Sequence, residues 1–436
     1  MRNSRQPVDA TLRLPETEIA AKGEFGFGAQ GRFDPALALN FRSADLRKAF
    51  VLASRASASP LAASGTANLL REGNNIVFDK LAFELAGSKG TGRLAFPAGD
   101  VSPFSGALSL DRANAAGLLA LALGQAQVSY VELGIPLLAN FPGALKMEIG
   151  SLAVSDRVSL QKAAFQIRAG RFETVFDDFQ AQLAGGRVSG MLRVADTLPR
   201  VLEIRLDLAD VALAQLLQAK PLRGALTAAV TLGASGNTED DLIASLSGRG
   251  ALVLSNLEIE RTDATAVSSV HASVKEAPDE KKIEQALLSV LDRGPLKVSK
   301  LEAPLVITNG MVRSGSAKAQ AGNIEIRLSG SLNIPKRSVD ALLNIEVVGG
   351  SSVRPGAMVR WAGPFDAPER TVDAKALITA ITLRAIERGG QNINLQEERP
   401  APAKKKRQPA KNEVESVPLL PPPANISPAP QPRSQN

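Results

Sequence analysis

A two-residue alternation of apolar with polar or small side chains recurs along most of this chain and constrains its fold more than any other feature. Successive side chains of a strand point to opposite faces of a sheet, so the alternation predicts strands with one buried face. The chain has 436 residues, which favours an elongated repetitive body or several domains over one ordinary core. The alternating segments are 10–14, 76–85, 104–110, 145–154, 160–167, 188–194, 202–208, 226–232, 250–257, 301–306, 324–332 and 341–348.

Two short repeats mark the strands and turns. In the first, a glycine stands two residues before a large apolar residue, a proline follows, and an Ala-Gly pair precedes three of the copies. This order predicts a strand, a glycine-containing turn, a second strand and a proline that ends the pairing. The first repeat begins at Gly31, Gly92, Gly190 and Gly330, and the second, Gly-Ala-Leu, begins at Gly106, Gly143, Gly224 and Gly250.

The spacing of the first repeat varies from roughly 60 to roughly 140 residues, which argues against a solenoid of fixed period. Short helical patterns follow some strands, at 44–50, 111–123 and 209–217. Stronger helical patterns cover 279–291, with an apolar stripe at 3-4 spacing, and 374–388. We therefore predict a mainly β fold, an elongated, curved, mostly antiparallel repetitive sheet with a few short helices.

The composition argues against several classes of function. There is no cysteine, which excludes disulfides and thiolate metal sites, and a single histidine, His271, which gives little basis for zinc sites or histidine-dependent catalysis. Aromatic residues make up only 4%, few for stacking nucleic-acid bases. The net charge of +7 is spread thinly, because seven basic and four acidic residues from Gln391 onward account for three of the charges. We expect no nucleic-acid partner.

Two glycine patterns resemble nucleotide-binding loops, and we interpret both as turns. The segment 26–31 matches G-x-G-x-x-G, but a dinucleotide site needs a helix next, and Arg32 to Pro35 has the pattern of a strand and a turn. The segment 87–92 resembles a phosphate-binding loop. That motif continues with Lys and Ser or Thr, whereas this chain has Arg93 and Leu94.

The remaining polar candidates also have simpler interpretations. His271 lacks a partner motif and is expected on the surface or in a linker. Adjacent acids at 177–178, 239–241, 279–280 and 397–398 are expected in solvated turns or at helix starts, since neighbours on a strand face opposite ways. The basic cluster 404–407 is expected to keep a proline-rich tail solvated. The sequence thus assigns no catalytic, cofactor-binding or metal-binding residue, and we expect a protein that is not an enzyme.

Three regions are expected along the chain. Residues 1–240 carry the upstream repeats, residues 241–390 carry the later strands and the two stronger helices, and residues 391–436 form a disordered, proline-rich basic tail. The longest apolar run, 115–124, is about half the length that a membrane-spanning helix needs. The N-terminus also lacks the apolar stretch of a secretory signal.

Five stretches in the later region resemble, in their order, the C-terminal region of the AsmA family of bacterial envelope proteins. A Gly-x-Gly strand is followed by a strand ending in Asn-Gly, by a Gly-x-Leu strand, by the segment Val-Asp-Ala-Leu-Leu, and by a Gly-Pro-Phe segment that closes with proline. The upstream units, 12–232, resemble the weaker upstream repeats of the family, so the resemblance covers about 12–388. The five stretches are 245–257, 301–312, 326–335, 339–343 and 359–373.

The resemblance implies a non-enzymatic cell-envelope protein that supports outer-membrane biogenesis. Members of the family are typically held in the inner membrane by an N-terminal helix, with the body in the periplasm, and related larger proteins look like grooves that conduct lipid. The implied partners are membrane lipid, phospholipid or lipid A, and envelope-assembly proteins. This chain lacks the anchor helix, so a truncated or split gene product is expected.

Physical chemistry agrees with the resemblance on one mechanism. A sheet face lined by Leu, Val, Ile and Ala is an apolar trough, in which an acyl chain gains about 0.8 kcal/mol per buried CH₂. The alternative is a structural β-rich spacer or an inactive fragment without a ligand, whose interior is filled by its own side chains. The alternation does not identify the lining residues, because a one-residue change of register exchanges the two faces.

Overall fold

The computed structural model describes residues 5–14, 16–28, 31–45, 62–98, 103–123, 133, 142–217, 222–274, 279–349 and 353–397. The chain divides into two units, Met1–Ile386 and Glu387–Asn436. All the described strands belong to the first unit, and of the second unit only residues 387–397 are described, at the end of a helix. Of the expected tail, residues 391–397 end helix α7 (Lys375–Glu397), whereas residues 398–436, with the cluster 404–407, lie outside the described residues.

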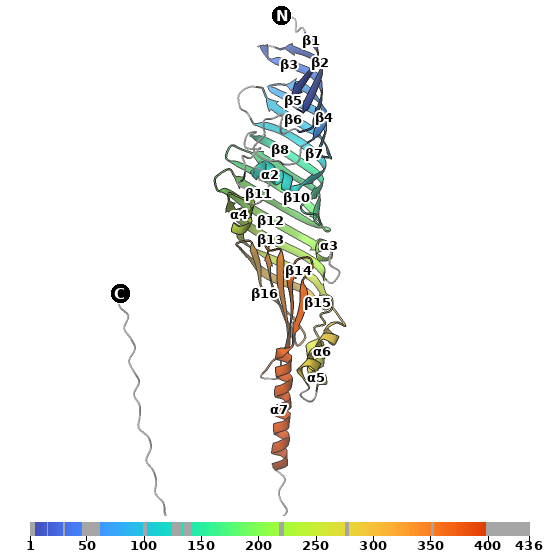
Figure 1. Cartoon of the computed structure of the whole chain (residues 1–436), viewed down its shortest axis with the longest axis vertical. Coiled ribbons are helices and arrows are strands. Elements are labelled where there is room, and N and C mark those ends of the chain that lie inside the picture. Colours follow the sequence, from blue (N-terminus) through green and yellow to red (C-terminus); the bar gives the residue numbers. More distant parts are fainter. Residues whose placement is uncertain are drawn as a thin grey trace, which may run out of the picture. The chain divides into compact units, whose positions relative to one another are not determined.

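One mainly antiparallel sheet of twenty strands makes up the first unit (Figure 1), so the expected fold class is confirmed. Each described strand pairs with its neighbours in the chain, with β1 and β20 at the two edges, and among the described strands only β7 and β8 pair in parallel. The strands are β1 Gln6–Leu14, β2 Thr17–Phe27, β3 Phe33–Ser43, β4 Ala63–Glu72, β5 Asn75–Leu85, β6 Ser88–Pro97, β7 Phe104–Asn114, β8 Gly143–Ala153, β9 Ser159–Ala169, β10 Glu173–Leu183, β11 Gly186–Ala195, β12 Arg200–Ala212, β13 Leu222–Gly236, β14 Ser247–Ile259, β15 Leu296–Thr308, β16 Met311–Ala321, β17 Ile324–Asn333, β18 Ser338–Val347, β19 Gly356–Pro364 and β20 Glu369–Asp373.

The expected glycine turns are confirmed as two-residue hairpin loops. Ala86 and Gly87, between β5 and β6, have φ of 49° and 79°. Ala184 and Gly185, between β10 and β11, have φ of 47° and 80°. Positive φ at both central residues defines the type I′ turn, whose twist matches that of the flanking strands. The sheet therefore grows by local hairpins, and β13 pairs with β14 across the boundary expected between residues 240 and 241. That boundary stays a prediction.

Several glycines inside the repeats lie beneath large side chains of neighbouring strands. A Cβ atom at Gly92 would meet Leu108 at 2.6 Å, and one at Gly143 would collide with the ring of Phe104. Glycine at these strand positions therefore leaves room for a bulky apolar neighbour on the same face. This packing explains the alternation of glycine with large apolar residues at these copies of the repeats.

The described helices correct several expected boundaries. Residues 111–114, expected to be helical, extend β7, and residues 209–212 extend β12. The expected helices near 279–291 and 374–388 are present as α6 and α7, whereas α4 and α5 were not predicted. Of the expected helix at 44–50, residues 46–50 lie outside the described residues. The described helices are α2 Ala115–Leu123, α3 Leu213–Leu217, α4 Glu239–Ser245, α5 Ala266–Ser273, α6 Glu280–Leu291 and α7 Lys375–Glu397.

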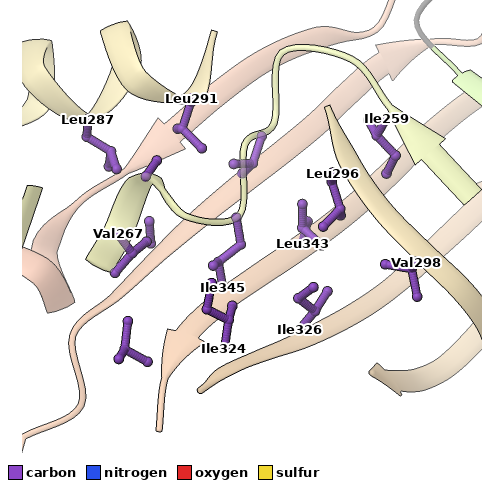
Figure 2. Packing of buried hydrophobic residues seen from close by; sticks show 14 of the residues in the cluster. Ile259, Val267, Leu287, Leu291, Leu296, Val298, Ile324, Ile326, Leu343 and Ile345 are labelled. Atoms are coloured by element: carbon purple, nitrogen blue, oxygen red, sulfur yellow. The ribbon is translucent and has the colours of Figure 1, made fainter. Parts of the chain in front are cut away.

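Three of these helices pack on one face of the later strands and form the largest core. Leu287 and Leu291 of α6 and Val267 of α5 are fully buried over strands β15 to β19 (Figure 2). Leu377 and Ile381 of α7 belong to the same cluster. The expected amphipathic stripe of 279–291 therefore faces the sheet.

An ion-pair clamp fixes the edge of this helical layer. Asp292, directly after α6, accepts hydrogen bonds from Arg261 at 2.8 Å and from Arg370 of β20 at 2.8 Å. Arg370 also donates to the backbone carbonyl of Arg261 at 2.8 Å. One carboxylate thereby joins the segment after β14, the end of α6 and the last strand.

We expect acid to release this clamp. The hydrogen bond from Arg261, followed by that from Arg370, lowers the pKa of Asp292 below its usual value. A carboxylate with a lowered folded pKa stabilises the fold above the ordinary value of about 3.9, and this stability is lost as the pH falls through the folded pKa. The side chain is 37% exposed, so the gain is about 1 kcal/mol or less. The difference in Tm between wild type and Asp292→Asn should therefore shrink below about pH 4. A difference that stays constant down to pH 2.5 would contradict this account.

Candidate functional site: the apolar face of the sheet

The strand register places the large apolar side chains of neighbouring strands side by side on one face. In the first strands, Leu12 lies opposite Ile19, Ile19 opposite Phe41, and Phe41 opposite Gly65. The same rule holds on later strands, where Ile204 lies opposite Leu232. We call this surface the apolar face and the other the polar face. Representative residues of the apolar face are Leu12, Ile19, Phe25, Leu37, Leu39, Leu69, Phe83, Leu94, Leu108, Met147, Phe165, Phe176, Leu192, Ile204, Val230, Leu252, Leu305, Ile326, Leu343 and Val359.

Every phenylalanine in a described strand projects onto the apolar face. Near the first strands, Phe25 and Phe27 lie 5.9 Å apart between ring centroids, and Phe25 and Phe33 also lie 5.9 Å apart. Phe96 and Phe104 form a stacked pair at 5.8 Å. Aromatic rings bury more area than most side chains, so the scarce aromatic residues are concentrated on this face. The set is Phe25, Phe27, Phe33, Phe41, Phe78, Phe83, Phe96, Phe104, Phe165, Phe176 and Phe179.

The apolar face is most exposed over β1 to β7, which we call the open segment. Leu12 is 55% exposed, Phe27 59% and Phe33 41%. Leu39 and Phe83, further along the segment, are half-buried. Contiguous exposed apolar surface of this kind usually marks a binding site.

The face is partly covered over β8 to β13. A buried cluster joins side chains of these strands to residues outside the sheet. These are Ala122 and Leu123 of α2, the separate residue Leu133, and Leu242 of α4. Other side chains of the same face stay half-buried, among them Ile204 and Val230. The exposed apolar surface of the open segment is therefore interrupted over β8 to β11, where Met147, Phe165 and Phe176 are buried, and half-buried side chains reappear on β12 and β13.

The face is closed over most of β15 to β19, although Leu332 at the end of β17 stays exposed. There α5, α6 and α7 cover it, and Ile326, Leu343 and Ile345 have no exposed surface (Figure 2). An interior packed at this density has no room for a ligand. The apolar face is thus most exposed near the first strands, buried over β8 to β11, half-buried over β12 to β14 and packed beneath helices over β15 to β19.

Charged side chains occupy the polar face, mostly in pairs across strands. Arg193 of β11 contacts Glu173 at 2.7 Å and Glu203 at 3.3 Å, and these hydrogen bonds raise its pKa above the usual value. Arg360 of β19 binds Asp340 of β18 at 2.7 Å, which lowers the pKa of that carboxyl. Such exposed pairs contribute little stability, but they keep this face hydrated.

The two glycine patterns lie in hairpins. The segment 26–31 joins β2 to β3, although residues 29–30 are outside the described residues, and the next element is a strand and not a helix. The segment 87–92 forms the β5–β6 turn and the start of β6. Both positions agree with their interpretation as turns.

The other polar candidates are dispersed. His271 lies half-buried in α5 and so is not in a linker. Asp279 caps α6, and acids 239–241 begin α4, as expected for helix starts. Asp177 and Asp178 instead lie within β10 at a bulge, where Asp177 pairs with Arg168, which corrects the expected turn. Glu397 ends α7, and Glu398 is outside the described residues.

Among the residues that the structure describes, no group of three or more His, Asp or Glu side chains is arranged to hold a metal ion. In the same part of the chain, no helix is both long and apolar enough to cross a membrane. What the described geometry offers is an apolar surface of graded exposure. Sequence reasoning did not identify the residues that line the apolar face. The signal that could have identified them is the period-two alternation combined with the positions of the hairpin turns.

Comparisons with known proteins identify no relative. No protein-family model, no curated protein and no solved structure matches the chain.

Proposed function

We propose that this protein is a non-enzymatic, AsmA-like envelope protein that holds or conducts lipid along the apolar face of its sheet and so supports outer-membrane biogenesis. The observation that carries the proposal is the accessible part of that face, where apolar side chains are exposed or half-buried over β1 to β7. The proposed location is the periplasm, in association with the inner membrane.

The energetics favour an acyl chain as the occupant. Neighbouring strands are about 4.8 Å apart, so the seven strands of the open segment offer roughly 30 Å of apolar surface across the strands. A chain of sixteen carbons, about 20 Å long at full extension, fits within this span. Burying only five of its methylene groups would contribute about 4 kcal/mol. The charged pairs of the polar face give that side no comparable affinity.

The packed region over β15 to β19 favours a second candidate. There the sheet is filled by its own helices, which is the arrangement expected of a structural spacer without a ligand. The two candidates differ in the open segment, where only the first requires a bound lipid.

Mass spectrometry of an organic extract from the purified, folded chain distinguishes them. The expected result is near-stoichiometric phospholipid or lipid A, and vesicle-incubated protein should take up the same lipid. A folded protein that carries no lipid, even after incubation with vesicles, would support the spacer.

A further inference from the structure

Two arginines and a threonine form one row across three strands of the polar face. Arg205 of β12 lies directly opposite Thr231 of β13, which lies directly opposite Arg249 of β14. All three side chains are exposed. Since neighbouring strands lie about 4.8 Å apart, the two arginine backbones are roughly 10 Å apart, with the threonine between them. A hollow of about 450 Å³ lies over this row.

Neither of these guanidinium groups has an acidic partner within the described part of the chain, where neither forms an ion pair or a side-chain hydrogen bond. The neighbouring row differs, because Arg193 is held by Glu173 and Glu203. The cations at the hollow are therefore available to an external anion.

The chemistry of the row suits a phosphate group. A guanidinium presents paired N–H donors that match two phosphate oxygens, and an arginine side chain is long enough for both groups to converge above Thr231. The threonine hydroxyl can donate a further hydrogen bond from the floor of the hollow. Asp207 also lines the hollow, and its negative charge opposes an anion, so the site suits one phosphate group better than a polyphosphate.

We propose that the hollow between Arg205 and Arg249 is a binding site for a single phosphate group, either free phosphate or the headgroup of a phospholipid. The site lies on the face opposite the apolar face. A lipid whose tail lies on the apolar face cannot also place its headgroup here, so this site is independent of the lipid-holding role.

Calorimetric titration of the full chain with inorganic phosphate at low salt tests the site. Arg205→Gln and Arg249→Gln should each weaken binding about tenfold or more, because each removes a charged hydrogen-bond donor. Asp207→Asn should tighten binding several-fold by removing a like charge. Arg187→Gln is the matched control, since Arg187 is an exposed arginine on the same face, on β11, that does not line the hollow.

A second arm identifies the source of the phosphate. Vesicles of phosphatidic acid in phosphatidylcholine are compared with phosphatidylcholine vesicles whose headgroups carry no net charge. Vesicle binding that depends on phosphatidic acid and is lost in both arginine variants assigns the site to a headgroup, whereas binding of inorganic phosphate alone assigns it to the free ion. The proposal is overturned if wild type binds neither, or if Arg187→Gln weakens binding as much as the two variants do. Either failure would leave lipid uptake by the apolar face unaffected.

Discussion

Replacement of Leu37, Leu69 and Leu94 together by aspartate is expected to remove most of the lipid from the purified protein. These three half-buried residues share one row of the apolar face with Phe78, across strands β3 to β6. A carboxylate that keeps even two methylene groups from contact costs about 1.6 kcal/mol, or roughly a tenfold loss of affinity. Three such sites should therefore reduce the lipid-to-protein ratio at least about tenfold.

The opposite face of the same strands provides the matched control. Asn40, Thr66 and Thr91 are exposed and share one row of the polar face across β3, β4 and β6. Changing these three to aspartate adds the same three carboxylates to the same strands. Lipid content should then change less than about twofold, because charge on this face does not displace apolar contacts.

If both triple variants lost lipid equally, the added negative charge itself would be the cause, whichever face carries it. That result would contradict an acyl chain bound on the apolar face. Circular dichroism and the thermal transition must first show that both variants are folded. If the triple apolar variant does not fold, the single change Leu69→Asp tests the same row, with an expected loss of roughly tenfold.

Local patterns in the sequence were sufficient to predict much of the sheet. The segment 324–332 is strand β17, Ile324–Asn333, because its side chains alternate without a break. The Ala-Gly pairs predicted hairpins because few residues other than glycine adopt positive φ at low cost. These signals act over a few residues, so they required no knowledge of the rest of the fold.

The predicted boundaries of helices and strands were wrong where pairing with a distant part of the chain decides the structure. The sequence pattern predicts that a helix starts at residues 111–114. In the structure, Arg112 and Ala113 extend β7 because they pair with Ser151 and Leu152 of β8. Helix α4 was missed although Thr238 and Asp241 form a capping box, because only a few apolar residues follow it. A seven-residue helix leaves too short a periodic pattern to recognise.

The side of the sheet that each residue faces could not be predicted from alternation alone. Lys80 and Asp178 adopt positive φ at points where the strand register shifts. Each such bulge inserts a residue and moves the following side chains to the other face of a simple alternation. The sequence also did not predict which strands the later helices cover, because an amphipathic stripe shows that a helix packs on something but not on what.

Truncation of Leu287 in α6 to alanine is expected to destabilise the protein by about 2–5 kcal/mol. Leu287 has no exposed surface and packs in the cluster that covers the later strands. The matched control is its neighbour Leu288, which is 39% exposed, and Leu288→Ala should cost less than about 1 kcal/mol. Urea denaturation of both variants measures the difference.

The same pair of variants tests where lipid can lie. If α6 closes the apolar face with its own side chains, Leu287→Ala should lower stability while the folded variant retains the lipid content of the wild type, because the proposed lipid lies over β1 to β7. A cost below 1 kcal/mol for Leu287→Ala would mean that α6 does not pack on the sheet. Loss of lipid from the folded variant would place an acyl chain beneath this helix, and the apolar face would then be a conduit over its whole length and not a trough closed by α5, α6 and α7.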